Sequence, residues 1–293
     1  GAGLPMLVAQ LLNLLYNVVD RIYIGHIPGV GASALTGVGL FTPILMLINA
    51  FAMMAGSGGA PRAAISMGSK DNDTAEKIMG TSFSLLLVFT AILTCVFYVL
   101  APRLLLLFGA SDITLPYAVD YSRIYILGSV FVLIVMGMNL FITTQGFSKI
   151  SMMTTVIGAV INIILDPIMI LAMGMGVKGA AIATSIGNTV AMLFYFIYLK
   201  VSHTMLTANP KHFAMKGGIF TGVFSIGIPM FFTNVLMSLS NLVLNRLLNN
   251  IDVLATGGMG IAMKANMLVV FLQLGIGIGI QPLVGFHYGA RNF

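Results

Sequence analysis

Long apolar stretches alternate with short polar links along most of the chain. A helix needs about 20 predominantly apolar residues to cross the ~30 Å hydrocarbon layer of a bilayer, and eight stretches reach that length. Lipid offers no partner to an unpaired backbone group, so spanning segments of this kind form helices. The pattern predicts an all-α polytopic membrane protein with spans at about residues 3–24, 35–67, 74–100, 113–144, 150–173, 178–200, 218–248 and 254–286.

The sequence at the beginning of the chain is repeated near its end. Gly3-Leu4-Pro5-Met6 reappears as Gly227-Ile228-Pro229-Met230, at an offset of 224 residues. After a three-residue deletion, Gly56-x-Gly58-x-x-Pro61 reappears as Gly277-x-Gly279-x-x-Pro282. Glycine and proline spacings of this kind rarely match by chance, so they indicate an internal duplication.

The second copy continues until Gly68 matches Gly289 and Lys70 matches Arg291, and the chain then stops. Two copies of equal length would give about 450 residues. We therefore expect three parts: a six-helix first lobe at residues 1–202, a cytoplasmic link at 203–217, and the first two helices of an incomplete second lobe at 218–293. Because six spans is an even number, both copies enter the bilayer in the same direction and form parallel halves.

Composition and charge support a membrane location. With 58% hydrophobic and 8% charged residues, the chain is far from soluble domains, of which about a quarter is charged. Lys and Arg occur seven times in the even-numbered links and twice in the odd-numbered ones, which places the N-terminus in the cytoplasm. The net charge of +6 is mostly this bias and does not indicate a nucleic-acid partner. We expect a monomer in the lipid bilayer of the cell membrane, and the single Cys95 excludes an intrachain disulfide.

Four polar side chains mark one face of the first span. Gln10, Asn13, Asn17 and Asp20 are three, four and three residues apart, which is the spacing of one helical face. An ionisable group inside a bilayer is costly, and it indicates by default a substrate path, an ion site or a proton relay. The alternative is a helix-end carboxylate that reaches interfacial water, since about five residues separate Asp20 from the outer link.

Asn162 and Asp166 form a second polar pair, on one face of the fifth span and directly before Pro167. Proline removes a backbone donor, and freed carbonyl groups beside a carboxylate suit a small cation. The alternative is an Asp-Pro kink that serves helix packing. Thr184 lies early in the sixth span. At 1.5 Å per residue, Asp20, Asp166 and Thr184 each lie within about 12 Å of the outer surface, which predicts one shared site.

Four motifs make the chain similar to a known family. They are Pro5…Asn17-x-x-Asp20-x-x-x-Ile24-Gly25, Gly58-Gly59-x-Pro61-Arg62, Gln145-Gly146 and Asn162-x-x-x-Asp166-Pro167. They resemble the multidrug and toxic compound extrusion (MATE) family over essentially the whole chain, and the branch looks like the bacterial MepA-like one. The resemblance implies twelve helices in two six-helix lobes, of which this chain would hold the first lobe and two helices of the second.

The same resemblance implies a secondary active antiporter that exports lipophilic, mostly cationic drugs in exchange for H⁺ or Na⁺. In members of the family with a cation site in the first lobe, the positions that carry it match Asp20, Asn162, Asp166, Thr184 and the Ala180 carbonyl. We expect Asn17 to join this site, and we expect Na⁺, if it is the coupling ion, to bind at Asp20, Asn162, Asp166 and Thr184. No further cofactor is expected.

A coupling mechanism follows from these residues. Two neighbouring buried carboxylates resist both being charged, and a proton or Na⁺ entering from outside relieves this repulsion. The first helix would then bend at Pro5, with Pro167 as a second hinge, and weaken drug binding in a central cavity. Polar residues avoid lipid, so the predicted cavity residues are Asn49, Asn139 and Gln145 in the first lobe, with Asn241, Asn245, Lys264 and Gln273 in the second.

Three other classes compete with this reading. An intramembrane aspartyl protease also uses two aspartates, but its patterns place Tyr before one and Gly before the other, whereas Val19 and Leu165 precede them here. A flippase for a lipid-linked precursor, from the same superfamily, tends to need a cationic cavity, and the buried charge of the first lobe is acidic. A receptor does not suit eight spans with a repeat. No nucleophile triad or His/Cys cluster indicates an enzyme.

Overall fold

The computed structural model describes residues 3–202 and 217–293. Nearly all of these residues are helical and none of them forms a β-strand, as the all-α prediction requires. The elements are α1 (Gly3–Gly25), α2 (Gly31–Leu40), α3 (Thr42–Gly68), α4 (Asn72–Leu107), α5 (Leu115–Leu127), α6 (Ser129–Thr144), α7 (Ser148–Asp166), the π-helical η1 (Pro167–Ala172), α8 (Val177–Val201), α9 (Gly217–Ile251) and α10 (Val253–Gly289).

The helices account for the predicted membrane spans. Among the described residues, seven segments are long and apolar enough to cross a membrane, and one of them, Gly31–Gly68, combines α2 and α3. Helices α5 and α6 pass the same test only together, as a span bent by 55°. The bend, which the sequence did not predict, falls at Gly128, where a Cβ would collide with the side chain of Ser185 on α8. A glycine there lets α8 lie directly against the bend.

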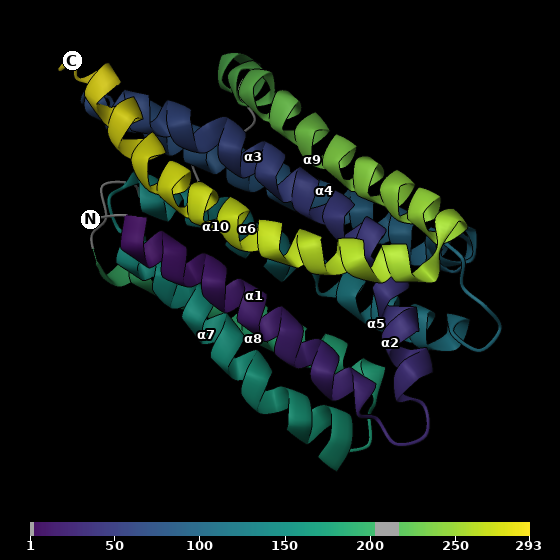
Figure 1. Ribbon diagram of the computed structural model, residues 1–293. Helices are drawn as coiled ribbons and strands as arrows, with labels where there is room; N and C mark the ends of the chain where they lie inside the picture. The colour runs from purple at the N-terminus through teal and green to yellow at the C-terminus, as the bar shows by residue number, and fades with distance from the viewer. Residues whose placement is uncertain (1–2, 203–216) are drawn as a thin grey trace.

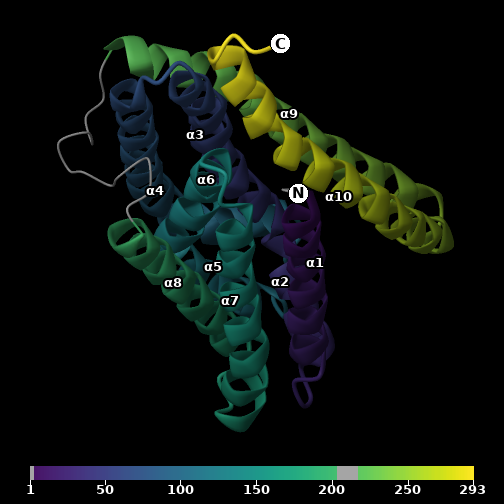
Figure 2. The ribbon, with the colours of Figure 1, turned by 90° about the vertical axis from the view of Figure 1, so that its left-hand side faces the viewer.

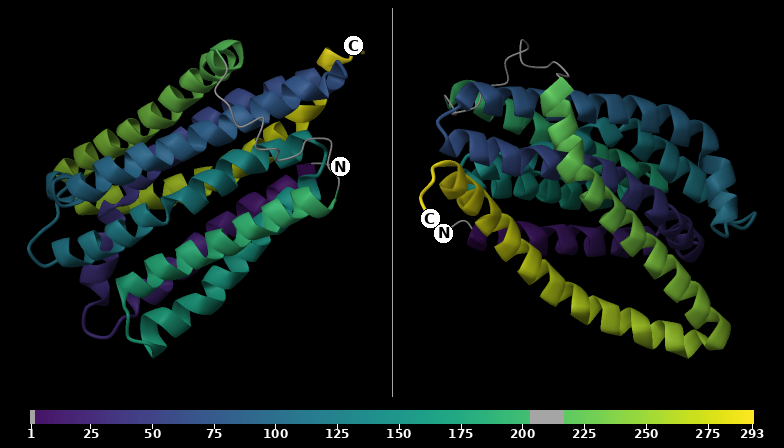
Figure 3. Two further views of the ribbon diagram at one scale, coloured as in Figure 1. Left: turned by 180° about the vertical axis from the view of Figure 1, so that it is seen from behind. Right: turned by 90° about the horizontal axis from the view of Figure 1, so that it is seen from above.

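Helices α1 to α8 form one bundle, against which α9 and α10 pack as a long hairpin (Figure 1). Helix α3 lies at the junction, because it contacts α4 and α6 of the bundle and also both helices of the hairpin. The hairpin meets the bundle near the end of α3 and diverges from α1 towards its own tip (Figure 2). The view from above shows the same divergence (Figure 3). Residues 203–216, most of the predicted link, lie outside the described residues.

Helices α3 and α10, which are equivalent in the two copies, end in the same backbone conformation. Lys70 after α3 and Arg291 after α10 have positive φ angles of 60° and 56°. In the first copy the next N–H, of Asp71, bonds the carbonyl of Ser66 at 2.9 Å, and the equivalent bond in the second copy is 3.0 Å long. A left-handed residue with a bond reaching five positions back is a common helix ending. The structure therefore supports the duplication at atomic detail.

Helix α7 changes its winding at the Asp-Pro step. Pro167 has no N–H to donate, and from this residue the chain continues as the wider π-helical turn η1. The N–H of Met173 bonds the carbonyl of Ile168, five residues back, at 2.8 Å. Turns of this kind inside helices occur frequently at functional sites. The wide turn begins directly after Asp166, the acidic residue that the sequence singled out.

Candidate functional site

Asp20 of α1 and Asp166 of α7 lie side by side. The two helices pack together, and the carboxyl groups are close enough to share a hydrogen bond. Asp20 is 8% exposed and Asp166 is fully buried. The Oδ1 atom of each is buried with no hydrogen-bond partner. Neither carboxyl is in an ion pair within the described ranges, so a proton or an added cation is needed to balance the pair.

Asn162 connects this pair to α8. It lies one turn before Asp166 and is 2% exposed. With its amide nitrogen turned towards Asp166, that nitrogen donates to Asp166 Oδ2 at 2.8 Å, and the amide oxygen accepts from Thr184 N at 3.2 Å and from Thr184 Oγ1 at 2.8 Å. The Thr184 hydroxyl also lies 3.0 Å from the carbonyl oxygen of Ala180. Two carboxyls, an amide, a hydroxyl and a backbone carbonyl therefore lie close together.

The two orientations of the Asn162 amide suit two states of Asp166. In the orientation above, Asp166 only accepts, which is what an ionised carboxylate does. In the opposite orientation the amide nitrogen donates to Thr184 Oγ1 at 2.8 Å, and the amide oxygen faces Asp166. That arrangement is satisfied only when Asp166 carries a proton, because two acceptors do not bond each other. The same side chain can thus serve a charged and a neutral site.

Aromatic side chains surround the Asp20 side of the pair. Phe41 packs edge-on against Tyr121 and Tyr125, with ring centroids 5.6 and 5.1 Å apart. Both tyrosines are buried. They and Tyr16 lie near enough to Asp20 for an electrostatic interaction with its carboxylate. Buried rings beside a carboxyl lower the local dielectric constant, which strengthens the electrostatic interactions of that carboxyl.

Asn17 and the two predicted hinge residues lie in different settings. The Asn17 side chain is exposed and donates to the carbonyl of Asn13 at 2.8 Å, so it does not meet the carboxyl pair in this conformation. Pro5 is buried in the first turn of α1, where a backbone N–H has no partner within the helix. Pro167 opens η1. The hinge roles stay predictions.

The residues predicted to line a drug cavity are also dispersed. Asn139 Oδ1 accepts from Thr154 Oγ1 at 2.8 Å, which ties α6 to α7. Asn49 Oδ1 is buried with no partner in the described structure. Gln145 borders a pocket of about 140 Å³ together with Phe286 of α10. In the hairpin, Asn241 is half-buried and Lys264 and Gln273 are exposed, while the side chain of Asn245 lies outside the described residues.

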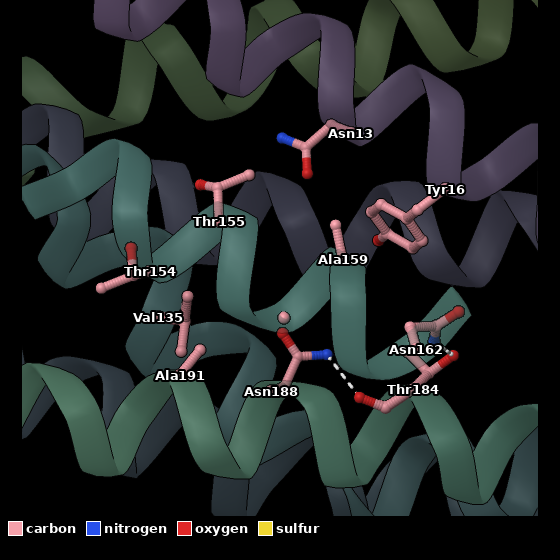
Figure 4. Close-up of a pocket in the computed structure, with 11 residues that line it drawn as sticks. Asn13, Tyr16, Val135, Thr154, Thr155, Ala159, Asn162, Thr184, Asn188 and Ala191 are labelled. Atoms are coloured by element: carbon pink, nitrogen blue, oxygen red, sulfur yellow. Dashed lines mark hydrogen bonds between the residues drawn. The ribbon is translucent and has the colours of Figure 1, made fainter. Parts of the chain in front are cut away.

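A small polar cavity adjoins the carboxyl pair between α1, α6, α7 and α8 (Figure 4). Its volume is about 50 Å³. Asn188 donates to the carbonyl of Thr184 at 3.0 Å. The spacing of four residues between Thr184 and Asn188 is the sequence signal that could have found this neighbour. The polar residues that line the cavity are Asn13 and Tyr16 of α1, Thr154, Thr155 and Asn162 of α7, and Thr184 and Asn188 of α8.

The available ligand atoms at the carboxyl pair are all oxygens. In residues 3–202 and 217–293, no three His, Cys, Asp or Glu side chains gather into a metal-binding group. Transition metals prefer nitrogen and sulfur ligands, whereas carboxylate, carbonyl and hydroxyl oxygens suit hard cations. The geometry therefore fits a proton or a small alkali cation better than a transition metal.

Comparisons with known proteins bear on the family and the fold of the chain. The family model described as MatE matches residues 5–168 and 229–293. The two matches start 224 residues apart, at Pro5 and Pro229, which is the offset of the predicted repeat. The multidrug export protein MepA of Staphylococcus haemolyticus is 30% identical over 286 residues, which are 98% of this chain and 63% of that protein. The chain thus spans less than two thirds of this relative.

Two solved structures have the same fold. A multidrug resistance MATE family transporter of the MOP superfamily, in an outward-facing conformation, aligns with a TM-score of 0.90 and 27% identity over 99% of this chain and 64% of its own. A MOP superfamily transporter from Pyrococcus furiosus aligns with a TM-score of 0.91 and 27% identity over the same shares. The latter is described as having a binding pocket of reversed polarity that suggests a different function.

Proposed function

The chain belongs to the MATE family, and from that premise we propose that the complete protein is a secondary active antiporter in the cell membrane. It exports lipophilic, mostly cationic compounds in exchange for H⁺ or Na⁺. The observation that carries the proposal is the buried pair of Asp20 and Asp166, for which no ion-pair partner is found in the described residues. Burying such a pair is costly unless a proton or cation binds, so ion binding is coupled to conformation.

The orientation follows from the charges of the links. Lys and Arg are concentrated in the even-numbered links, which assigns these links and the N-terminus to the cytoplasm. The carboxyl pair then lies in the outer half of the bilayer, where an ion entering down its gradient arrives first. The ends of α3 and α10 lie on the cytoplasmic side.

The two copies touch reciprocally at this cytoplasmic end. A Cβ at Gly68 would collide with the carbonyl of Phe286, and a Cβ at Gly289 would collide with the carbonyl of Ile65. These residues are repeat equivalents at the offset of 221. The hydroxyl of Ser69 also donates to the carbonyl of Gly289 at 3.0 Å. Direct backbone contact here, with divergence of the hairpin at the other end (Figure 2), supports an outward-facing state of an alternating-access cycle.

The cycle uses the carboxyl pair as its switch. A proton or Na⁺ from outside neutralises the pair, and Asn162 turns its amide to match the new state of Asp166. Helix α1 then bends at Pro5, and η1 absorbs the strain next to Asp166 because its wider turn is less tightly bonded. The bend lowers the affinity of the cavity for the drug, which leaves to the outside. The lobes then rock, and the ion is released to the cytoplasm.

The identity of the exported compound rests on the acidic character of the first lobe. A fold shared with a transporter of reversed pocket polarity does not by itself determine the substrate. The relative from Staphylococcus haemolyticus is a multidrug export protein, and a buried acidic pair favours cationic substrates. The flippase and protease alternatives gain no support from these relatives.

An efflux assay with the complete protein tests the proposal. Proteoliposomes would be loaded with a fluorescent lipophilic cation, and the Na⁺ and H⁺ gradients would be imposed separately. We expect export driven by one of the two gradients and abolished by the matching ionophore. Export that persists without either gradient would contradict antiport.

A further inference from the structure

A line of buried polar side chains runs along α7 from the carboxyl pair to the start of the helix. On the N-terminal side of Asp166 and Asn162 in α7, the hydroxyl residues Thr154, Ser151 and Ser148 are only 1%, 4% and 6% exposed. Spacings of four, eight, three and three residues keep them on one face. A membrane helix has little reason to bury so many polar groups unless they bond one another or meet water.

Helix α8 presents a matching face. Thr184, Asn188, Ala191 and Tyr195 follow one another at spacings of four, three and four residues, which is one helical face. Tyr195 is 2% exposed, and its hydroxyl is buried with no partner in the described structure. Buried tyrosine hydroxyls usually find a hydrogen-bond partner, and ordered water supplies one where protein does not.

The polar cavity lies between these two faces. On α1, α7 and α8 its lining extends from the carboxyl pair towards the proposed cytoplasmic side: Asn13 and Tyr16 precede Asp20 on α1, Thr155 precedes Asp166 on α7, and Asn188 follows Thr184 on α8. Figure 4 shows the amide of Asn188 between α7 and α8, in line with Thr184. A volume of about 50 Å³ has room for a few water molecules, since one needs roughly 10–15 Å³.

We propose that the seam between α7 and α8 is a hydrated passage by which the coupling cation leaves the carboxyl pair for the cytoplasm. The inference rests on the proposed antiport. The cation would travel inside the first lobe, whereas the drug crosses between the lobes. In this conformation the passage is closed, because the cavity ends near Thr154 and Ala191, and Tyr195 is buried one turn beyond. Tyr195 is the gate residue of the passage.

Cysteine accessibility in membrane vesicles tests the passage without any drug. The lone Cys95 is first replaced by alanine, and Asn188→Cys is introduced in the complete protein. Ag⁺, a monovalent cation that reacts with thiolates, is added to one side of the membrane at a time. The matched control is Ile186→Cys, two residues away on α8, whose native side chain is 38% exposed on the outer surface of the bundle.

We expect Asn188→Cys to react with Ag⁺ from the cytoplasmic side at least about ten times faster than Ile186→Cys, because a thiol in lipid stays protonated and unreactive. Tyr195→Ala should raise the rate further, and Tyr195→Phe should leave the gate closed. If Asn188→Cys does not fold, Thr155→Cys tests the same cavity from α7.

Reaction only from the outside, or reaction no faster than at the lipid-facing control, would overturn the passage. The outcome is independent of drug export. A protein that exports nothing but reacts at Asn188→Cys from the cytoplasm refutes the antiporter and keeps the passage. Normal export with unreactive cysteines keeps the antiporter and refutes the passage.

Discussion

Helices α1 and α9 start from the same repeated sequence and end in different surroundings. In α1, Asp20 is buried against α7. The equivalent position in α9 is Leu244, so the second copy lacks the carboxylate that lies beside Asp166 in the first. The amide of Asn234 and the hydroxyl of Ser238 in α9 donate to carbonyl groups of their own helix. The polar stripe is thus kept in both copies, whereas the carboxylate is present only in the first.

The C-terminal ends of α3 and α10, which are equivalent in the two copies, show the opposite behaviour. Gly68 and Gly289 each lie against a backbone carbonyl of the other copy, and the helix endings after them have the same conformation. The duplicated halves therefore keep their symmetry where Gly68 and Gly289 pack against each other's copy. They differ at Asp20, which matches Leu244 in the second copy.

The largest effect is expected from moving the charge between the copies. Asp20→Asn should reduce gradient-driven efflux to the level of vesicles without protein. The amide that replaces the Asp20 carboxylate is uncharged, so it neither takes up a proton nor balances the charge of Na⁺. Adding Leu244→Asp to this variant should not restore efflux, because α9 packs against α3, α4 and α10 and so keeps the new carboxylate away from Asp166 on α7 and Thr184 on α8. Efflux of a fluorescent cation and detergent-solubilised yield of the folded protein would be measured together.

Recovery of efflux in the double variant would show that the second copy carries an equivalent site. In that case the difference between α1 and α9 would be one of sequence alone. Leu244→Asn is the matched control, since it changes polarity without adding charge.

The reciprocal glycine contact should respond equally to changes on either side. Gly68→Val and Gly289→Val each place side-chain atoms against a backbone carbonyl, and overpacking of this kind costs about 1–3 kcal/mol. We expect both variants to lose the outward-facing state and most of the efflux. Gly39→Ala is the control, because a Cβ there meets nothing within 4 Å. Distances between spin labels on the cytoplasmic ends of α3 and α10 would show whether the junction has opened, and an effect from only one glycine would contradict the symmetry.

Removing one hydroxyl group from each copy tests whether ion binding depends on the first copy alone. Thr184→Val keeps the shape of the side chain and deletes its bonds to Asn162 and Ala180. Hydrogen bonds that support a charged group contribute about 1.5–3 kcal/mol, so binding of the coupling ion should weaken at least about tenfold. Ser238→Ala in α9 removes only a bond within its own helix and should leave ion binding unchanged. Isothermal titration with Na⁺ at several pH values measures both, and equal losses would argue against a site confined to the first lobe.

The smallest effect concerns the turn between α3 and α4 in the first copy. Asp71 caps α4, accepting from the hydroxyl of Thr74 at 2.6 Å and from its N–H at 3.2 Å, and these bonds lower the pKa of Asp71 below its ordinary value of 3.8. The capping contribution is therefore complete above that value and is lost as the pH falls through the lowered pKa. Hydrogen exchange of the first-turn amides of α4 should accelerate on acidification. Asp71→Asn, which copies the equivalent Asn292, should remove this pH dependence, and unchanged acceleration in the variant would point to another group.

Much of the fold could be predicted because bilayer thickness sets helix length. The eight apolar stretches and the duplication follow from spacing and polarity, and the matching depths of Asp20, Asp166 and Thr184 predicted one shared site without showing which side chains touch. The bend at Gly128 could not be predicted, since it depends on how closely Ser185 of α8 approaches. Asn188 and Tyr16 were also missed, because a polar residue in a membrane helix shows its role only when the facing helix is known.

The sequence by itself determined that the chain crosses a membrane, that it is duplicated, and that one copy carries acidic residues which lipid should exclude. These properties are local, because they depend on the cost of placing a given side chain or backbone group in hydrocarbon. Only the tertiary structure decided that Asp20 meets Asp166, that Asn17 points away from them, and that a polar cavity lies behind the pair. These depend on which faces of α1, α7 and α8 pack together, and packing is settled by the shape and polarity of all three helices at once.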